Sequence, residues 1–258
     1  MSASKRELSS VSGTRRRIQR LARALSVARL LPRRSKPVMQ VSLEPSWTPI
    51  PECAQRTEVV RLPAFFSKEE TEKILALGET VPVHRFLREE KWETRYLHAD
   101  GRFATALPTL LDKLLAAAHM VDTQQGWGLL TGRAIGVRLA EMHRVQPSMS
   151  STLLARKHYD RGSLLTLDVM LKPAAAGGIF STLEVGGRLR DHQFEMGDLL
   201  VFVSHKYHCV SGVEEGTRCV MVLELWEGEP RVCAHRCDTR CGECERGENE
   251  PPDRRPHR

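Results

Sequence analysis

The chain has 258 residues, enough for one large domain or two small ones, and its hydrophobic content of 41% allows a hydrophobic core. No run of 18 apolar residues occurs, so we expect no transmembrane helix. The net charge of +7 is concentrated at one end, because residues 1–40 hold 11 of the 39 basic residues and one of the 32 acidic residues. The other 28 basic and 31 acidic residues make the body mildly acidic, which removes the main argument for a nucleic-acid partner there.

The basic leader, residues 1–40, is rich in Arg and Ser, and residues 15–25 have the pattern of a basic amphipathic helix. This composition is typical of a transit peptide to a mitochondrion or plastid, and equally of a disordered basic tail on a cytoplasmic protein. A secretory signal is excluded because Arg23 and Arg29 interrupt any apolar core. Residues 41–56 contain three prolines and are predicted to be a linker.

The folded body is predicted to begin near Thr57 with a short strand over 59–62. Ser67 and Glu70 have the spacing of a capping box and predict the start of a helix, for which Gly78 is a candidate end. A second strand is expected over 94–98. A second helix is expected over 108–121, because a proline opens it and leucines recur on one side.

From residue 135 onward the pattern changes to short apolar runs separated by Gly, Pro and Ser. The predicted strands are 135–145, 163–171, 178–183, 198–203 and 217–226. Several short strands with turn signals between them indicate a sandwich or barrel. The expected fold class is therefore mainly β with flanking helices (α+β).

A His-x-Asp triplet, His158-Tyr159-Asp160, stands just before one of these predicted strands. In an extended segment residues i and i+2 project from the same face, so both side chains can reach one cation. The triplet alone is a weak signal, because short motifs have many chance matches.

A second signal follows some fifty residues later, where His208 comes after the strand 198–203 and Arg218 stands ten residues beyond it. The segment 214–216 has turn composition, so we expect His208 and Arg218 on opposite arms of one hairpin. Even-numbered residues of both arms would then share a face. The odd-numbered residues of the second arm are also apolar, which favours a sheet with helices packed on its back.

Two histidines and one carboxylate on one face of a site leave three coordination positions open. That is the facial triad of non-haem Fe(II) oxygenases. Two open positions suit a bidentate 2-oxo acid and the third suits dioxygen. A guanidinium deeper in the pocket can bind the far carboxylate of 2-oxoglutarate through two parallel hydrogen bonds.

The stretch 158–226 resembles the catalytic core of the prolyl 4-hydroxylase-like branch of the Fe(II)/2-oxoglutarate oxygenases. The matching segments are His158-Tyr159-Asp160, Gly162-Ser163-Leu164-Leu165-Thr166, Gly177-Gly178-Ile179-Phe180, Gly197-Asp198 with Phe202, and His208 with Arg218 ten residues on. A weaker match extends the similarity over most of 57–228. The resemblance implies a double-stranded β-helix (jelly roll) domain over 57–229, with its core at 135–228.

The resemblance also implies a function, the hydroxylation of a substrate with release of succinate and carbon dioxide. It requires Fe(II), 2-oxoglutarate and dioxygen, with ascorbate often needed to keep the iron reduced. Iron is expected on His158, Asp160 and His208, and 2-oxoglutarate on Arg218, where the prolyl enzymes commonly have Lys. The substrate would be a peptidyl residue, as in prolyl hydroxylases, or a small molecule.

Two features of the site are less well determined by the sequence. The family's Tyr on the strand before the triplet has no match, so Thr166 and Thr182 are the candidates for a second 2-oxoglutarate contact. The substrate pocket is expected to be formed by 80–105 and 145–157, where Trp92, Arg95 and Tyr96 are candidate lining residues. All three could equally be packing residues.

Other readings of the same residues compete with this one. His205 is a rival to His208, but it faces the other way along a regular strand and lacks the continuation to Arg218. His143 and His192 fit no position of the triad. The alternative function is a non-catalytic or differently metallated jelly-roll binding module, because this architecture serves many functions.

The tail, 230–258, contains four cysteines within twelve residues and is otherwise expected to be flexible. The four are Cys233, Cys237, Cys241 and Cys244. Bound zinc, paired disulfides and free thiols all remain open, because only the last pair has a common zinc spacing. A zinc-dependent interaction protein would account for this tail alone. Cys53, Cys209 and Cys219 are interpreted as isolated thiols.

Overall fold

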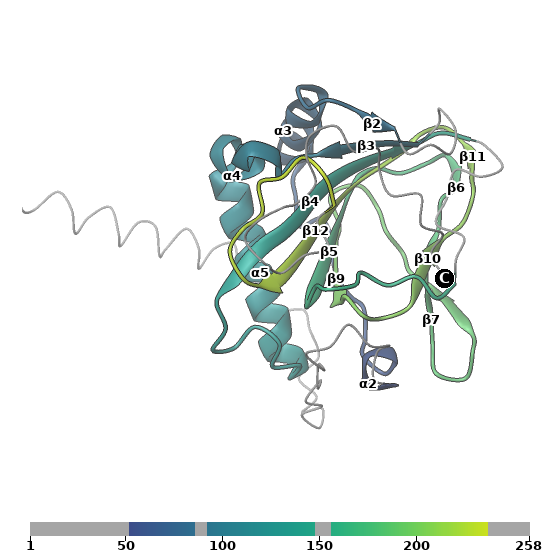
Figure 1. The fold of residues 1–258 in the computed structure, drawn as a ribbon. Coiled ribbons are helices and arrows are strands. Elements are labelled where there is room, and N and C mark those ends of the chain that lie inside the picture. The colour runs from purple at the N-terminus through teal and green to yellow at the C-terminus, as the bar shows by residue number, and fades with distance from the viewer. Residues whose placement is uncertain (1–51, 86–91, 148–155, 237–258) are drawn as a thin grey trace, which may run out of the picture. The chain divides into compact units, whose positions relative to one another are not determined.

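The computed structural model describes residues 52–85, 92–147 and 156–236 (Figure 1). The basic leader, most of the linker and Cys237, Cys241 and Cys244 lie outside these ranges. The elements in chain order are α2 Glu52–Gln55, β1 Val60–Leu62, α3 Lys68–Glu79, β2 His84–Arg85, β3 Trp92–Tyr96, the 3-10 helix Ala99–Gly101, α4 Arg102–Ala106, α5 Pro108–Gln125, β4 Ile135–Val145, β5 Leu165–Lys172, β6 Ala176–Gly177, β7 Phe180–Leu183, β8 Leu189–Asp191, β9 Leu199–Val203, β10 His208–Val210, β11 Val213–Glu215 and β12 Arg218–Glu227. No helix in the described ranges is long and apolar enough to span a bilayer.

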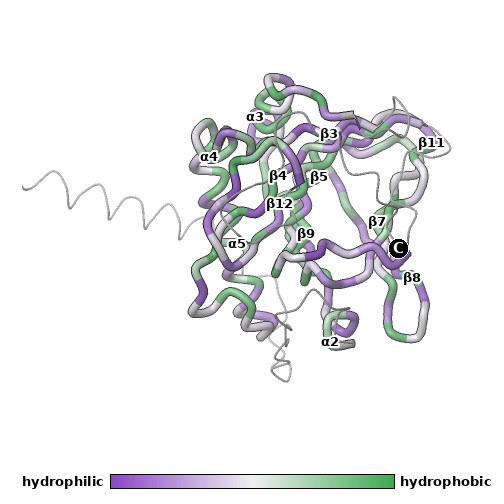
Figure 2. The backbone as a smooth tube through the Cα atoms, viewed as in Figure 1, coloured by the Kyte–Doolittle hydropathy of each residue, from purple (hydrophilic) through white to green (hydrophobic). Residues whose placement is uncertain are grey.

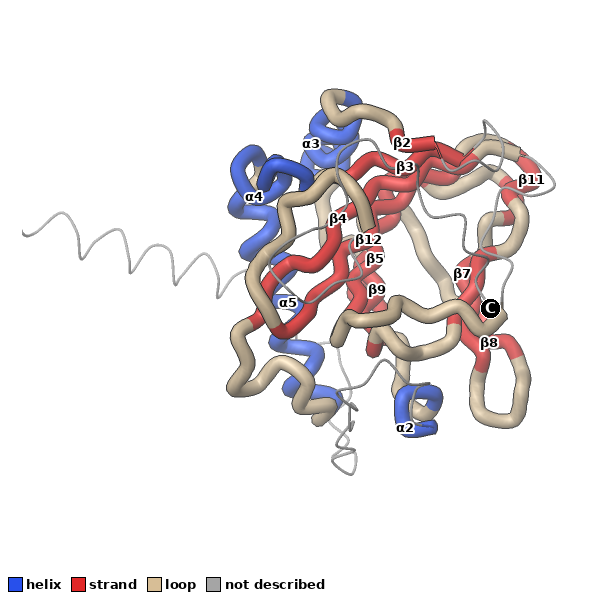
Figure 3. The backbone as a smooth tube through the Cα atoms, in the orientation of Figure 1, coloured by secondary structure: helices blue, strands red, loops and turns tan. Residues whose placement is uncertain are grey.

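Antiparallel sheets form the body of the domain. The large sheet has seven strands in the order β1-β9-β5-β12-β4-β3-β2. The strands of a three-stranded sheet (β10-β7-β8) and of a β11-β6 pair lie away from α3, α4 and α5, which cover the other side of the large sheet (Figures 1 and 3). The predicted class, mainly β with flanking helices, is confirmed.

The two principal helices form where the sequence predicts them, because their ends carry strong signals. Ser67 and Glu70 make the reciprocal hydrogen bonds of a capping box at the start of α3. Pro108 opens α5, and Gly126 ends it in the left-handed conformation. Gly78 does not end α3 as predicted. A Cβ atom there would collide with the Met142 side chain, so this glycine permits close packing of helix on sheet.

The central strand β12 is buried on both faces. Its odd-numbered residues Cys219, Met221, Leu223 and Leu225 join the core that includes residues of α3 and α5. Its even-numbered residues project the other way, into the space between the sheets. Figure 2 shows hydrophobic and hydrophilic residues alternating along its neighbour β4. Alternation of this kind supplies an apolar back for the helices and a polar interior for a site.

The predicted hairpin joining His208 to Arg218 is wrong. β10 pairs with β7, β11 pairs with β6, and β12 lies in the large sheet between β5 and β4. Gly212 and Gly216 flank β11 and divide the run into three strands, so the chain crosses from the small sheets to the large one. His208 and Arg218 therefore belong to different sheets.

Two segments outside the predicted domain are part of it. Residues 231–236, here named the C-terminal strap, return to the large sheet, where Arg231 N–H donates to the Val137 carbonyl and Asp100 N–H donates to the Val232 carbonyl, both at 2.9 Å. The expectation of a loose chain after Glu229 is therefore wrong for the strap. At the other end, α2 occupies the last residues of the predicted linker.

Helix α2 fastens the turn that leads to His208. The Gln55 amide donates to the His205 carbonyl and accepts from Tyr207 N–H, both at 2.9 Å, and the Lys206 ammonium donates to the Gln55 carbonyl at 3.0 Å. Ala54 is completely buried. The domain boundary therefore lies before Glu52.

This boundary can be tested by deletion. A chain lacking residues 1–51 should unfold at the same temperature as the full chain. A chain lacking residues 1–56 should lose ~2–4 kcal/mol, because each of three hydrogen bonds contributes ~1 kcal/mol and Ala54 leaves an apolar gap. Thermal and urea unfolding measure the difference. Equal stability of the two truncated chains would contradict the role given to α2.

Candidate active site

Three side chains with metal-binding chemistry converge in the domain interior. His158 and Asp160 lie in the loop before β5, and His208 opens β10. One donor atom from each lies within 4.8 Å of the donor atoms of the other two. No other group of three potential ligands was found in the described ranges. The structure thus brings together the three residues that the sequence pattern separates by some fifty positions.

Main-chain hydrogen bonds set the positions of these ligands. His208 N–H donates to the His158 carbonyl at 2.9 Å, which forms an isolated antiparallel bridge between the two segments. Asp160 N–H donates to the Ser204 carbonyl, also at 2.9 Å. Because the backbones are tied directly, the two histidine rings are held edge to face with their centroids 5.0 Å apart.

Side-chain contacts orient the donor atoms. His208 Nδ1 lies 3.0 Å from the Lys206 carbonyl, which favours a proton on Nδ1 and leaves Nε2 as the ligand atom. His208 Nε2 is 3.8 Å from one Asp160 oxygen, and His158 Nε2 is 3.4 Å from the other. Thr166, predicted as a candidate 2-oxoglutarate contact, instead donates its hydroxyl proton to Asp160 Oδ2 at 2.7 Å.

The protonation states suit metal binding. Burial lowers the pKa of His208 to about 4 despite the opposing charge of Asp160, so the ring is neutral at pH 7. Burial alone would raise the pKa of Asp160, but the neighbouring histidines and Arg236 hold it well below its usual range. A neutral imidazole and an ionised carboxylate are the forms that bind metals.

His205, the rival ligand, is not part of the group. Its carbonyl accepts from Gln55, and its ring packs edge to face on Tyr159 at 5.8 Å between centroids. His205 lies in the turn between β9 and β10, whereas His208 is the first residue of β10. The three-residue offset therefore places His208 in the group of potential ligands and leaves His205 outside it.

The remaining histidines and Thr182 form separate contacts. His143 Nε2 is 3.0 Å from Glu141. Thr182 is opposite His208 in the β7–β10 register, but its hydroxyl bonds to His192 Nε2 at 2.7 Å and to Glu184 at 2.6 Å. The predicted 2-oxoglutarate role of Thr182 would require its hydroxyl to exchange these partners.

Arg218 lies at the start of β12 with only 4% of its surface exposed. Its Nε has no hydrogen-bond partner among the described residues. Gly178, in the left-handed conformation beside β6, makes room for it, because a Cβ there would lie 2.9 Å from Arg218 Cδ. A buried guanidinium with an unused N–H group is suited to bind a carboxylate ligand.

Asp168 on β5 is the acid that acts electrostatically on Arg218. Burial and the negative charge of Asp160 raise the pKa of Asp168 to about 8, although Arg218 opposes the shift. At pH 7 Asp168 therefore carries a proton. The charge of Arg218 is then left for an anionic ligand.

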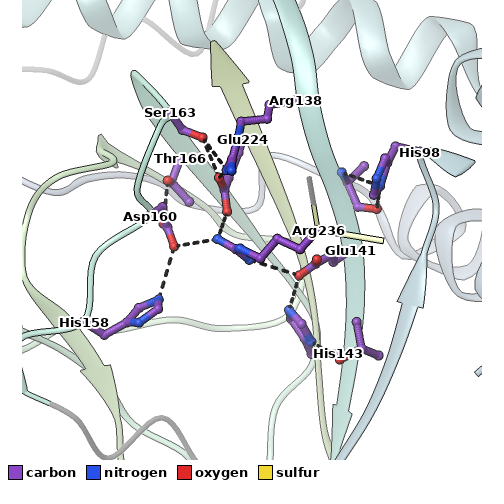
Figure 4. Close-up of polar contacts among 12 residues, drawn as sticks. His98, Arg138, Glu141, His143, His158, Asp160, Ser163, Thr166, Glu224 and Arg236 are labelled. Carbon is purple, nitrogen blue, oxygen red and sulfur yellow. Dashed lines mark hydrogen bonds and ion pairs between the residues drawn. The ribbon is translucent and has the colours of Figure 1, made fainter. Parts of the chain in front are cut away.

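Sequence reasoning missed a second polar cluster beside the metal ligands (Figure 4). Glu141 on β4 and Glu224 on β12 are both completely or almost completely buried, and Arg236 of the strap lies between them and Asp160. Acidic residues at inward positions of otherwise apolar strands were the available signal for the two glutamates. No sequence pattern indicated that Arg236 would reach the site, because it lies in the tail that was predicted to be flexible.

The candidate pocket residues divide between two faces of β3. Trp92 and Tyr96 stand opposite Val145 and Glu141 in the β3–β4 register. Arg95 points the other way and donates to the carbonyls of Gly78 and Val81 at the end of α3. Trp92 and Tyr96 therefore remain candidates for the pocket wall, whereas Arg95 is a packing residue.

Comparisons with solved structures show which known proteins share this fold. No family model and no curated protein sequence matches the chain. An oxidoreductase of the 2OG-Fe(II) oxygenase family from Burkholderia pseudomallei is 19% identical, over 69% of this chain and 87% of that one, with a TM-score of 0.51. HygX from Streptomyces hygroscopicus, solved with nickel and 2-oxoglutarate bound, is 13% identical over 67% of this chain and 85% of that one, with a TM-score of 0.52.

A third solved structure with a similar fold contains a bound peptide. A prolyl hydroxylase from Trichoplax adhaerens, in complex with a hypoxia inducible factor peptide fragment, is 14% identical over 67% of this chain and 84% of that one, with a TM-score of 0.51. At sequence identities this low, the similarity establishes the fold alone. The chain has the jelly-roll fold of the 2-oxoglutarate–Fe(II) oxygenases, as the sequence resemblance implies.

The metal ligands can be tested by substitution. Asp160→Ala and His208→Ala should weaken Mn²⁺ or Fe²⁺ binding by more than the ~10–100-fold that loss of an outer-shell partner costs, because a direct ligand is removed. His205→Ala is the matched control and should bind metal as the native chain does. Anaerobic calorimetry measures the affinities. Equal damage from His205→Ala would reassign the third ligand.

The proton on Asp168 predicts a pH dependence of stability. Between pH 4 and 8 the folded, metal-free protein holds a proton that the unfolded chain has released, so Asp168 lowers stability as pH rises through this window. Asp168→Asn removes the titration. The native chain loses stability as pH rises and the variant does not. The free energy of unfolding of the variant minus that of the native chain should therefore rise by up to ~1 kcal/mol per pH unit. Urea unfolding at pH 5, 6.5 and 8 tests this, and a pH-independent difference would contradict it.

Proposed function

We propose that the chain is an Fe(II)- and 2-oxoglutarate-dependent dioxygenase that hydroxylates its substrate. The observation that carries the proposal is the group of His158, Asp160 and His208, whose donor atoms lie within 4.8 Å of one another. Two imidazoles and one carboxylate fit Fe(II) and leave coordination positions for a co-substrate and dioxygen. A structural zinc site would normally have four protein ligands.

The bound iron and 2-oxoglutarate would supply the oxidising chemistry: one atom of dioxygen enters succinate as 2-oxoglutarate loses carbon dioxide, and the other is inserted into a C–H bond of the substrate. The chain's own residues prepare the site. Thr166 and the Lys206 carbonyl orient the ligand atoms. Phe180 and Phe202 pack against the His208 ring at 5.6 and 5.2 Å between centroids and exclude water from one side. Ascorbate would serve to keep the iron reduced.

Arg218 would anchor the far carboxylate of 2-oxoglutarate. Its planar guanidinium can make two parallel hydrogen bonds to a carboxylate. Gly178 leaves room for the aliphatic part of this side chain. The 2-oxoglutarate-bound structure of HygX supports the assignment of this ligand to the fold.

The substrate would be a peptidyl residue or a small molecule. The Trichoplax prolyl hydroxylase structure contains a peptide fragment, and a HygX structure contains hygromycin B, so both classes occur among proteins of this fold. The alternative function is a jelly-roll binding module without turnover. Consumption of 2-oxoglutarate distinguishes the two.

Turnover without a substrate provides the test. With Fe(II), ascorbate, dioxygen and 2-oxoglutarate, the protein should release succinate slowly, because this step needs only the metal site and the 2-oxoglutarate anchor. Arg218→Ala should raise the 2-oxoglutarate concentration for half-maximal rate at least ~10-fold, since a buried charge-assisted pair contributes ~2–3 kcal/mol.

The matched controls separate charge from geometry. Arg218→Lys should fall between the native chain and Arg218→Ala, because lysine keeps the charge and loses the fork. Iron binding should be unchanged in both variants. Succinate is measured by mass spectrometry. A native protein that binds iron but never consumes 2-oxoglutarate would favour the binding module.

A further inference from the structure

The C-terminal strap carries an arginine to the metal ligands. Arg236 Nη2 lies 3.3 Å from Asp160 Oδ1, and Nη1 lies 3.4 Å from Glu141 Oε2. Nη2 also hydrogen bonds to Glu224 Oε1. Figure 4 shows the guanidinium between the three carboxylates. One side chain from outside the sheets therefore occupies the space beside the prospective metal.

The two glutamates belong to the walls of the site. Glu224 Oε2 accepts from Arg138 at 2.7 Å and from the Ser163 hydroxyl at 2.5 Å, which leaves Oε1 directed to Arg236. Glu224 is fully buried and 1% of Glu141 is exposed. Both are fixed on strands, and neither is a member of the metal-ligand group.

Glu141 has binding capacity that Arg236 does not use. Its Oε2 is shared by His143 at 3.0 Å and Arg236 at 3.4 Å, while its Oε1 is buried with no hydrogen-bond partner among the described residues. An unused acceptor on a buried carboxylate costs free energy. The pocket thus offers more acceptors than the strap arginine satisfies.

Arg236 differs from its partners in how it is held. Its side chain is 33% exposed, whereas those of its three carboxylate partners are at most 5% exposed. It is delivered by an extended segment after β12 rather than by a strand. The two glutamates are thus held by strands of the large sheet, whereas the arginine lies on a segment outside the strands and is partly exposed.

We infer that Glu141 and Glu224 form a guanidinium-binding subsite for the substrate, that the substrate carries an arginine side chain, and that Arg236 occupies this subsite in cis. The inference rests on the proposed oxygenase function and names its substrate class. A guanidinium bridges two carboxylates with separate N–H groups, which a lysine ammonium cannot match in geometry. An arginine bound there places its carbon chain beside the metal ligands, and a substrate must first displace Arg236.

The test uses binding without turnover. The full chain and its Arg236→Ala variant are loaded with Fe(II) and 2-oxoglutarate without dioxygen and titrated with Nα-acetyl-arginine N-methylamide by calorimetry. The variant should bind the compound at least tenfold more tightly than the native chain, because the competitor in cis is gone. The uncharged citrulline analogue should bind the variant at least tenfold more weakly. Free L-arginine distinguishes an amino-acid substrate from a peptidyl one.

Two controls make the result specific. Arg190→Ala removes an exposed arginine that pairs with Glu58 at 2.8 Å, and it should bind as the native chain does. Adding Glu141→Gln to Arg236→Ala should abolish the preference for arginine over citrulline. An Arg236→Ala variant that folds normally and binds both analogues equally would overturn the inference and leave Arg236 as a structural counter-ion.

A variant that folds poorly still gives an answer. Millimolar methylguanidinium should then raise the melting temperature of Arg236→Ala more than methylammonium does, with no such difference in the native chain. Absence of this rescue would also overturn the inference. The binding assays exclude dioxygen and do not depend on turnover. Their failure therefore leaves the oxygenase proposal intact if the native chain releases succinate in the separate assay with dioxygen. Arginine binding without any 2-oxoglutarate consumption would instead contradict the oxygenase proposal, and the two glutamates would then form a guanidinium-binding site without turnover.

Discussion

Buried negative charge is the constraint on which the interior of this domain depends. The four carboxylates concerned are Glu141, Asp160, Asp168 and Glu224, none more than 6% exposed. A buried carboxylate must be protonated, paired with a cation or bound to a metal. Asp168 takes the proton, Glu224 pairs with Arg138, and Asp160 points one donor atom toward those of two histidines. The strap arginine completes the balance, so a substrate that displaces it must itself bring positive charge.

The fold makes such an interior possible because its central strands have two different faces. On β12 one face joins the apolar core that includes residues of α3 and α5, while the other presents Arg218 and Glu224 between the sheets. β4 repeats the division, with Met142 in that core and Glu141 opposite. The helices therefore stabilise the sheet from behind, and the polar face is free to hold ligands. Glu141, Arg218 and Glu224 lie on strands, which hold side chains more firmly than loops do.

Much of this arrangement follows from local sequence. The capping box at Ser67 predicts α3. Along the segment that forms β12, the separation of odd-numbered from even-numbered residues predicts that the strand has two faces. Spacing also predicts the metal-ligand group. His158 and Asp160 form a His-x-Asp triplet, and His208 is followed ten residues later by Arg218. The hairpin prediction failed because the chain changes sheets around β11, where Gly216 takes the left-handed conformation, and short-range patterns do not reveal such a crossing. The docking of Arg236 was invisible for the same reason, because it depends on carboxylates that lie 12, 76 and 95 positions away in the chain.

The central claim is that one pocket binds a metal and 2-oxoglutarate together. Anaerobic calorimetry of the native chain with 2-oxoglutarate, with and without Fe(II), tests it most directly. The account predicts one 2-oxoglutarate per chain, bound tightly only when iron is present, because the co-substrate would contact both the metal and Arg218. Binding of equal strength in metal-free protein, or no binding with iron present, would contradict it.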